Sequence, residues 1–158
     1  MKVASIQDIK SELANTPHQG LVDICLRLAK YKLDNKELIS YLLFEANDEV
    51  GYTKLVKQQI EEDFKGLNKR SHFLAKKTIR KALRTANKHS KYSGNKQTEL
   101  ELLIHFSKQL RTSGLTLRAN TVIGNIYQRQ LLKIKKILSG LHEDLQYDYH
   151  DEVEMLGK

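Results

Sequence analysis

The side chains whose types and spacing most clearly suggest a chemical role are the cations in the middle of the chain. Residues 65–98 hold 11 basic and no acidic side chains, in a protein whose net charge is +8. Arg80 and Arg84 repel each other one helical turn apart, so a surface selected only for solubility would place Glu among them. We therefore expect one helix face to bind an anion: nucleic-acid phosphates, an acidic protein or an anionic lipid surface. The predicted anion-binding residues are Lys76, Lys77, Arg80, Lys81, Arg84, Lys88 and Lys91.

Two other interpretations of these cations stay open at this point. They can form a solvated helix face, or acidic side chains of the N-terminal helices or the C-terminal tail can neutralise them within the fold. Phe73 and Tyr92 are the only aromatic residues near the run, and the chain has no Trp. A bound nucleic acid would therefore be held mostly through its phosphates and would be released by salt. Arg129, Lys133 and Lys136 would extend the surface only if their helix packs beside the basic one.

Metal binding has weaker support in the sequence. Glu101 and His105 are four residues apart and could form half of a metal site, and an acidic, His-containing tail follows. The tail residues concerned are His142, Asp144, Asp148, His150 and Asp151. The H-x-x-x-H and E-x-x-H patterns of zincins and di-metal bundles do not occur. We therefore predict no metal site and no cofactor.

Nucleophilic catalysis and phosphate binding by a loop are also disfavoured. Cys25 stands among Leu21, Ile24 and Leu28, which predicts a buried, unreactive side chain. No G-x-S-x-G pattern frames a serine. The turn at residues 93–95 precedes a helix start, but it lacks P-loop spacing and favours an ordinary capped turn. We predict no catalytic residue, and a binding protein rather than an enzyme.

Apolar residues recur at helical spacing along nearly the whole chain, without the period-two pattern of a strand. Thr16 with Gln19, and Thr98 with Glu101, resemble capping boxes. The predicted helices begin near Ile6, Pro17, Asp34, Glu49, Ser71, Thr98 and either Asn120 or Thr121. The last of these is predicted to be the longest, and a partly helical tail follows His142. The expected inner face of the basic helix is Ala75, Ile79, Ala82, Leu83 and Ala86. These elements predict an all-α compact helical bundle, or a short stacked helical array, of about seven helices.

The length of the chain suits a single helical domain over residues 1–158, with an acidic C-terminal segment at 142–158. One cysteine forms no internal disulfide, and no apolar run approaches the ~18 residues of a membrane span. A signal-peptide pattern is also absent. We therefore expect a cytoplasmic protein with no membrane span.

Three segments resemble an uncharacterised family of short all-helical bacterial proteins, a domain of unknown function. They are YLLFEA at 41–46, the stretch containing IRKALR and KYSGNKQTELELL at 79–103, and the run from NIYQRQLLKIKK to LHEDLQYDY at 125–149. The resemblance implies a bacterial, cytoplasmic, helical protein and assigns no activity, cofactor or catalytic residue.

The sequence as a whole predicts a non-catalytic binding module with a basic helix face that contacts an anionic partner. Nucleic acid or an acidic protein is the expected partner class. The alternative is a protein–protein adaptor or a homo-oligomeric structural protein that binds no nucleic acid.

Overall fold

The computed structural model describes residues 2–158 and is all-helical, which confirms the predicted fold class. In that range it contains eight α-helices and one π-helical turn, Tyr41–Glu45, and no strand. The predicted number was about seven, and the eighth comes from the acidic tail, which is a full helix. The helices are α1 (Ile6–Asn15), α2 (His18–Tyr31), α3 (Leu33–Ser40), α4 (Glu49–Lys65), α5 (His72–Ser93), α6 (Lys96–Thr112), α7 (Val122–Ser139) and α8 (Glu143–Gly157).

Contacts within the chain divide it into two compact units, Met1–Phe44 and Glu45–Lys158. The prediction of a single domain over residues 1–158 stays a prediction. The first unit contains α1, α2 and α3, with α2 packed against α3. None of these three helices has a buried side chain.

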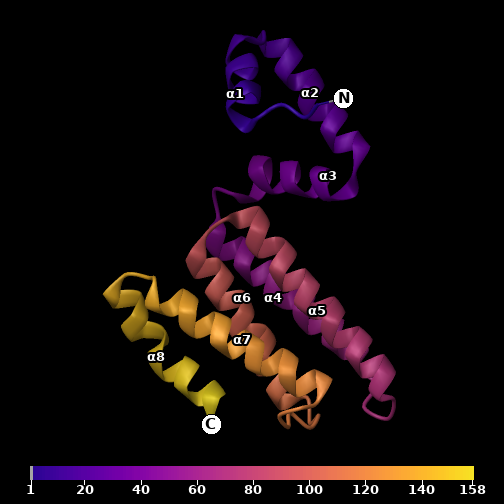
Figure 1. The fold of residues 1–158 in the computed structure, drawn as a ribbon, viewed down its shortest axis with the longest axis vertical. Helices are drawn as coiled ribbons and strands as arrows, with labels where there is room; N and C mark the ends of the chain where they lie inside the picture. The colour runs from indigo at the N-terminus through magenta and orange to yellow at the C-terminus, as the bar shows by residue number, and fades with distance from the viewer. Residues whose placement is uncertain (1) are drawn as a thin grey trace. The chain divides into compact units, whose positions relative to one another are not determined.

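The second unit holds a core centred on α6. Helix α6 packs against α4, α5, α7 and α8, and α8 also packs along α7 (Figure 1). The fully buried apolar side chains of α6 point toward more than one neighbouring helix, which is typical of a helix enclosed by others. They are Leu100, Leu102, Leu103, Phe106 and Leu110. Burying each such side chain contributes about 1.5–3 kcal/mol, so α6 anchors the helices around it.

Local capping fixes where α5 and α7 begin. Ser71 caps α5 by accepting a hydrogen bond from the backbone N–H of Leu74, and Thr121 caps α7 in the same way through Gly124. Both starts agree with the sequence prediction. Helix α5, with 22 residues, is longer than α7, with 18, so the prediction that the latter is the longest element was wrong.

Three predicted helix starts differ from the observed ones by one or two residues. Thr98 lies buried inside α6, and Asn95 caps that helix instead. The N-cap of α2 is Pro17, whose ring has no atom that can accept a hydrogen bond from the backbone N–H groups of the first turn. The hydroxyl of Thr16 donates instead to the carbonyl of Glu12. Helix α3 begins at Leu33, before the predicted Asp34.

None of the helices in residues 2–158 combines the length and the apolar composition that crossing a bilayer requires.

Candidate anion-binding surface

Small apolar residues hold the inner side of α5 against the core. Ala75, Ile79, Ala82 and Ala86 are fully buried, as predicted, and α5 packs against both α4 and α6. Three alanines among the four let the helices approach closely. The basic residues must then occupy the outer side of α5. The fifth predicted inner residue, Leu83, is only half-buried.

The outer side of α5 carries an open groove of about 480 Å³, which we call the α5 groove. Its lining residues all come from this one helix: Phe73, Lys76, Lys77, Arg80, Leu83, Arg84 and Asn87. Four of the seven predicted cations therefore surround one hollow. Lys77, Arg80 and Arg84 are exposed and Lys76 is half-buried.

Most of the predicted cations have no partner within the described chain. In residues 2–158, no hydrogen bond or ion pair joins the following side chains to another residue: Lys76, Lys77, Arg80, Arg84 and Lys91. Lys88, by contrast, does interact within the chain. The cations of the α5 groove are therefore available to an external anion.

Lys81 has a structural contact instead. Its ammonium lies 2.8 Å from the carboxylate of Asp63, whose side chain is 1% exposed. The hydroxyl of Thr85 donates to the same carboxylate at 2.7 Å. An isolated buried carboxylate would be strongly unfavourable, so both bonds are needed to hold the charge there. The cluster ties α5 to α4 and leaves Lys81 outside the groove lining.

A second hollow, of about 200 Å³, lies where α7 packs beside the C-terminal half of α5. We call it the α5–α7 hollow. The ammonium of Lys133 donates to the side-chain carbonyl of Asn87 at 3.2 Å and forms an ion pair with Glu99 at 2.8 Å. The hollow is lined by Asn87, Ser90, Lys91, Gly94, Lys96, Glu99 and Lys133. The condition set from the sequence is thus met for Lys133, because its helix does pack beside α5.

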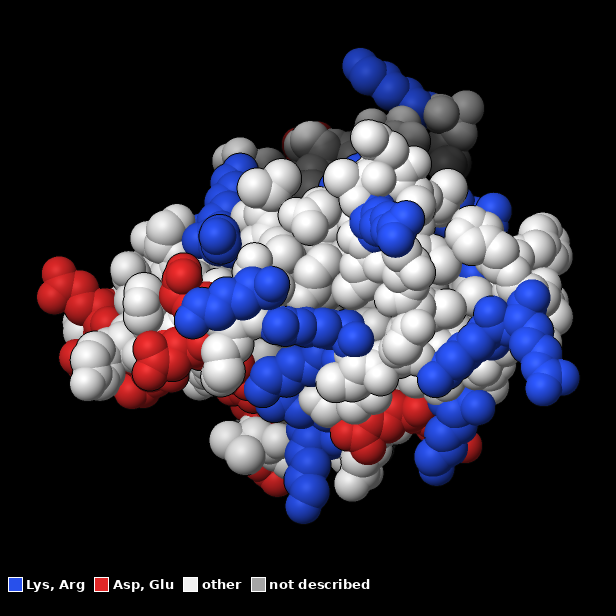
Figure 2. Space-filling view, turned by 90° about the horizontal axis from the view of Figure 1, so that it is seen from below, with Lys and Arg blue, Asp and Glu red and all other residues white. Residues whose placement is uncertain are grey.

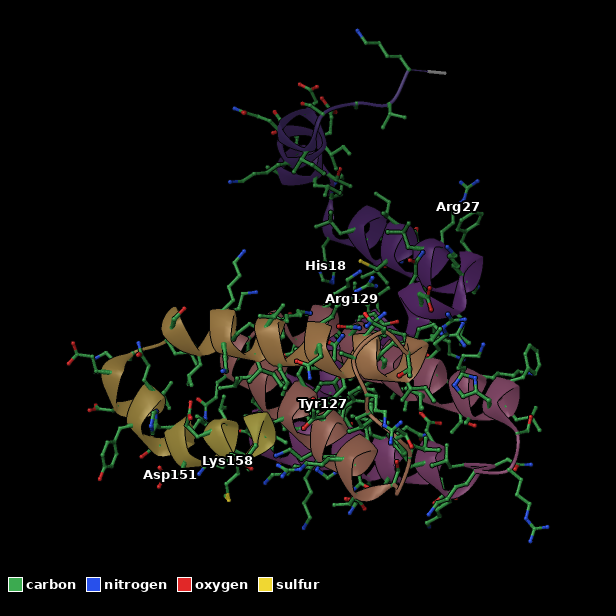
Figure 3. All side chains as sticks on the ribbon, turned by 60° about the horizontal axis from the view of Figure 1, so that its bottom comes forward. His18, Arg27, Tyr127, Arg129, Asp151 and Lys158 are labelled. Atoms are coloured by element: carbon green, nitrogen blue, oxygen red, sulfur yellow. The ribbon has the colours of Figure 1, made fainter. Side chains whose placement is uncertain are left out.

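Arg129 and Lys136 occupy the same stripe of α7 as Lys133 and are exposed. Tyr127 and Arg129 leave α7 on opposite sides (Figure 3). Tyr127 is buried and donates to the carbonyl of Leu156 at 2.7 Å, which fixes the end of α8 against α7. The rotation of α7 is therefore set by its buried side, and this leaves Arg129 in solvent.

Glu99 is the one acidic side chain that lines the α5–α7 hollow. Burial alone would raise the pKa of Glu99, but hydrogen bonds and charges from Lys133 and Lys96 outweigh it and hold the pKa below its ordinary value. The carboxylate is thus ionised at neutral pH and offsets one of three lysines around the hollow. The hollow keeps a positive balance.

The acidic tail has its contacts on the other helices of the second unit. Helix α8 packs against α6 and α7, Glu152 pairs with Lys108, and the carbonyl of Met155 accepts from Arg111. Figure 2 shows Lys and Arg side chains across the middle and right of one face, and many of the acidic side chains toward its left edge. These contacts of the tail are with α6 and α7, and they leave the α5 groove lined by cations.

Glu101 and His105, the possible metal half-site, point to different partners. Glu101 pairs with Lys57 at 2.6 Å and accepts a hydrogen bond from the hydroxyl of Tyr149 at 2.7 Å. His105 lies 3.1 Å from Glu61. Among residues 2–158 no three His, Cys, Asp or Glu side chains group together as metal ligands. Glu101 and His105 therefore connect α6 to α4 and α8.

Charge and burial shift the pKa values of Glu101, His105 and Tyr149. Burial tends to raise the pKa of Glu101, but the bonds from Lys57 and Tyr149 lower it below its ordinary value. Burial and the bond to Glu101 raise the pKa of Tyr149 to about 12. Burial is also the main cause of the lowered pKa of His105. At neutral pH, Glu101 is therefore charged and both Tyr149 and His105 are neutral.

Two smaller sequence expectations have opposite outcomes. Cys25 is exposed, so the prediction that it is buried was wrong. No side chain of α2 is buried, so the apolar neighbours of Cys25 do not enclose it. The turn before α6 is an ordinary capped turn, as predicted. Gly94 ends α5 with φ +66°, and Asn95 accepts from the N–H groups of Gln97 and Thr98, which a phosphate would otherwise use.

The sequence did not identify Leu83 and Asn87 as part of the candidate surface. Leu83 was assigned to the inner face, and Asn87 lies close after Arg84 in a position that drew no attention because it is uncharged. Spacing places Asn87 beside the cations, but only the packing of α7 makes it the residue shared by both hollows.

Comparison of the chain with protein-family models, with curated proteins and with solved structures finds no match.

Proposed function

We propose that this protein is a non-catalytic binding module whose α5 groove holds the phosphates of a nucleic acid. The cations of the groove act as electrostatic contacts, so binding is strong at low salt and weakens as salt rises. The bacterial cytoplasm, and membership of the helical bacterial family that the sequence resembles, belong to the same proposal.

One observation carries it: four cations line a single open groove, and no acidic side chain in the described chain pairs with any of them. Some cations elsewhere in the second unit are tied to carboxylates, as Lys57 is to Glu101 and Lys133 to Glu99. Others, such as Lys54 and Lys135, are exposed single cations outside the two hollows, so the α5 groove differs in holding four cations together. An unpaired cluster in a concave surface supports an external anion as the partner.

The test is fluorescence-anisotropy binding of labelled RNA and DNA, single- and double-stranded, at several salt concentrations. The test variant replaces the four cations of the groove by Gln: Lys76, Lys77, Arg80 and Arg84. A matched control replaces four exposed cations outside both hollows: Lys54, Arg118, Lys135 and Lys158. Both variants lose the same charge, so they separate a local site from the overall field of the protein.

We expect the wild type to bind with a dissociation constant in the micromolar range at low salt. In the test variant the slope of log K against log salt should fall by about 0.7–0.9 for each phosphate that the protein no longer neutralises. The control should keep nearly the full slope. Equal effects of the two variants would show that net charge, not the groove, attracts the nucleic acid.

Absence of binding even at low salt would reject the nucleic-acid proposal. The adaptor or homo-oligomer alternative would then have the stronger case. Its candidate surface is the exposed apolar side chains of α1 and α2, such as Ile6, Ile24 and Leu28.

A further inference from the structure

We infer that the nucleic acid is single-stranded and lies along α5, passing from the α5 groove into the α5–α7 hollow. This inference rests on the proposed function and adds to it the class of strand and its path. Three observations lead to it: the adjacency of the two hollows along one helix, the spacing of the cations and the apolar part of the groove.

The two hollows adjoin along one helix. Asn87 lines both of them. From Phe73 at one end to Gly94 at the other, the helix rises about 31 Å at 1.5 Å per residue. Unpaired cations stand in each hollow, with Arg84 before Asn87 and Lys91 after it. This track suits one extended polyanion better than a small anion.

The cations repeat at a spacing that suits a phosphate backbone. Lys76, Arg80 and Arg84 are each four residues apart, which separates them by about 6 Å along the helix axis. Neighbouring phosphates along one strand have a similar separation. Successive phosphates can therefore contact Lys76, Arg80 and Arg84 in turn while α5 keeps its regular helical geometry.

The α5 groove also has an apolar part that only unpaired bases can use. Phe73 is 72% exposed and Leu83 lies among the cations of the lining. Bases of a single strand can stack on an exposed aromatic ring, which contributes to sequence-tolerant binding. The base faces of a duplex are already stacked on one another, so a duplex would leave Phe73 in solvent.

The experiment compares strands of equal phosphate number on the full-length protein. Labelled oligo(U) strands of increasing length, and hairpin duplexes with matched phosphate counts, are titrated by anisotropy at two salt concentrations. The variant is Phe73→Ala. Tyr147→Ala is the matched control, because Tyr147 is also a strongly exposed aromatic, at 85%, and lies on α8. Thermal melts confirm that both variants are folded.

We expect single strands to bind at least tenfold more tightly than matched duplexes. Their affinity should rise with length and then level off once the strand spans the track. Phe73→Ala should weaken single-strand binding about tenfold and leave the salt slope unchanged. Tyr147→Ala should leave the affinity as in wild type.

Two outcomes overturn the inference. Equal affinity for duplex and single strand, or unchanged affinity in Phe73→Ala, would contradict a single strand in the groove while phosphate binding itself stood. Binding to neither form at low salt would reject the proposed function, and this inference with it.

Discussion

At the scale of single residues, the protein uses its charges in two ways. Lys57, Lys81 and Lys133 each meet a carboxylate of a neighbouring helix, at 2.6–2.8 Å, and so join elements of the second unit. Lys77 and Arg84 meet no carboxylate in the described chain. An exposed ion pair contributes little to stability, but Asp63 is almost fully buried and depends on its partners. The same residue type therefore serves the fold in α4 and α7 and the surface in the α5 groove.

The lowered pKa of His105 makes the stability of the protein depend on pH. Burial lowers the pKa of His105 below its ordinary value of 6.5, so the folded protein takes up this proton at a lower pH than the unfolded chain does. Between those two pKa values the unfolded state binds more protons, and the free energy of unfolding falls as the pH falls. The charges around the ring are Glu61, which favours the proton, and Lys57 and Lys108, which oppose it.

Urea unfolding at pH 7.5, 6.5 and 5.5 measures this effect. The wild type should become less stable from pH 6.5 downward, and His105→Gln should change less over the same range. A further decrease is expected below pH 4.5 in both proteins, because Glu99 and Glu101 have lowered pKa values in the folded state. Identical pH profiles in the two proteins would show that His105 does not cause the first decrease.

The residues that the sequence predicted correctly are those whose role depends on their own helix. The spacing of Ala75, Ile79, Ala82 and Ala86 was enough to identify the buried side of α5. Roles that depend on another helix were missed: Lys81 was grouped with the surface cations because Asp63 is 18 residues away in the chain. Thr98 was taken for a cap because a buried hydroxyl that donates to Glu49 leaves no local signal.

At the scale of the element, the start of α7 is tightly constrained by the loop before it. Gly124 faces the loop before the helix, and a Cβ on it would lie 2.0 Å from the carbonyl oxygen of Arg118. It would also lie 2.8 Å from the hydroxyl oxygen of Thr121, which is the cap of α7. Since the closest atom belongs to the backbone, a side chain at position 124 displaces the loop itself.

We predict that Gly124→Ala lowers the free energy of unfolding by about 1–3 kcal/mol, the usual range for overpacking. Gly66→Ala is the control, because a Cβ there meets no atom within 4 Å. The control should be neutral or slightly more stable, since alanine restricts the unfolded chain. Urea denaturation of both variants measures the difference, and equal midpoints would contradict the steric argument.

The helices themselves follow from their patterns, but their order in space does not. Periodicity identified α1 to α7 apart from errors of a few residues at the ends, whereas the tail after His142, predicted to be partly helical, is the full helix α8. It gave no sign that α6 is the central helix, because burial on several sides depends on which neighbours surround it. The pairing of α7 with α5, on which the extended basic surface depends, is information of the same kind.

At the scale of the whole molecule, the two units differ in how much core they contain. All buried apolar side chains in the described chain except that of Tyr41 belong to residues 45–158. Helices α1, α2 and α3 have none. Local opening is easiest where little apolar surface is exposed by it, so the first unit should open at lower free energy than the second.

Hydrogen exchange measured by mass spectrometry tests this difference. Amides of α1, α2 and α3 should exchange much faster than those of α6, and exchange in α6 should report global unfolding. Addition of a saturating nucleic acid should slow exchange in α5 and leave the first unit as before. Equal protection in both units would show that the apolar side chains of α1 and α2 are covered in solution.

The absence of acidic residues from α5 also has an evolutionary consequence. Replacing Lys77 by Glu would turn a repulsion with Lys81, one turn away, into an attraction of a few tenths of a kcal/mol. Lysine and glutamate codons differ by a single base, so such changes arise often by chance. Under the proposed function, a lineage that kept the fold but lost the anionic partner would therefore be expected to gain acidic residues on α5 first. Position 77, more than any residue of the core, would then indicate whether a descendant still has the proposed anion binding.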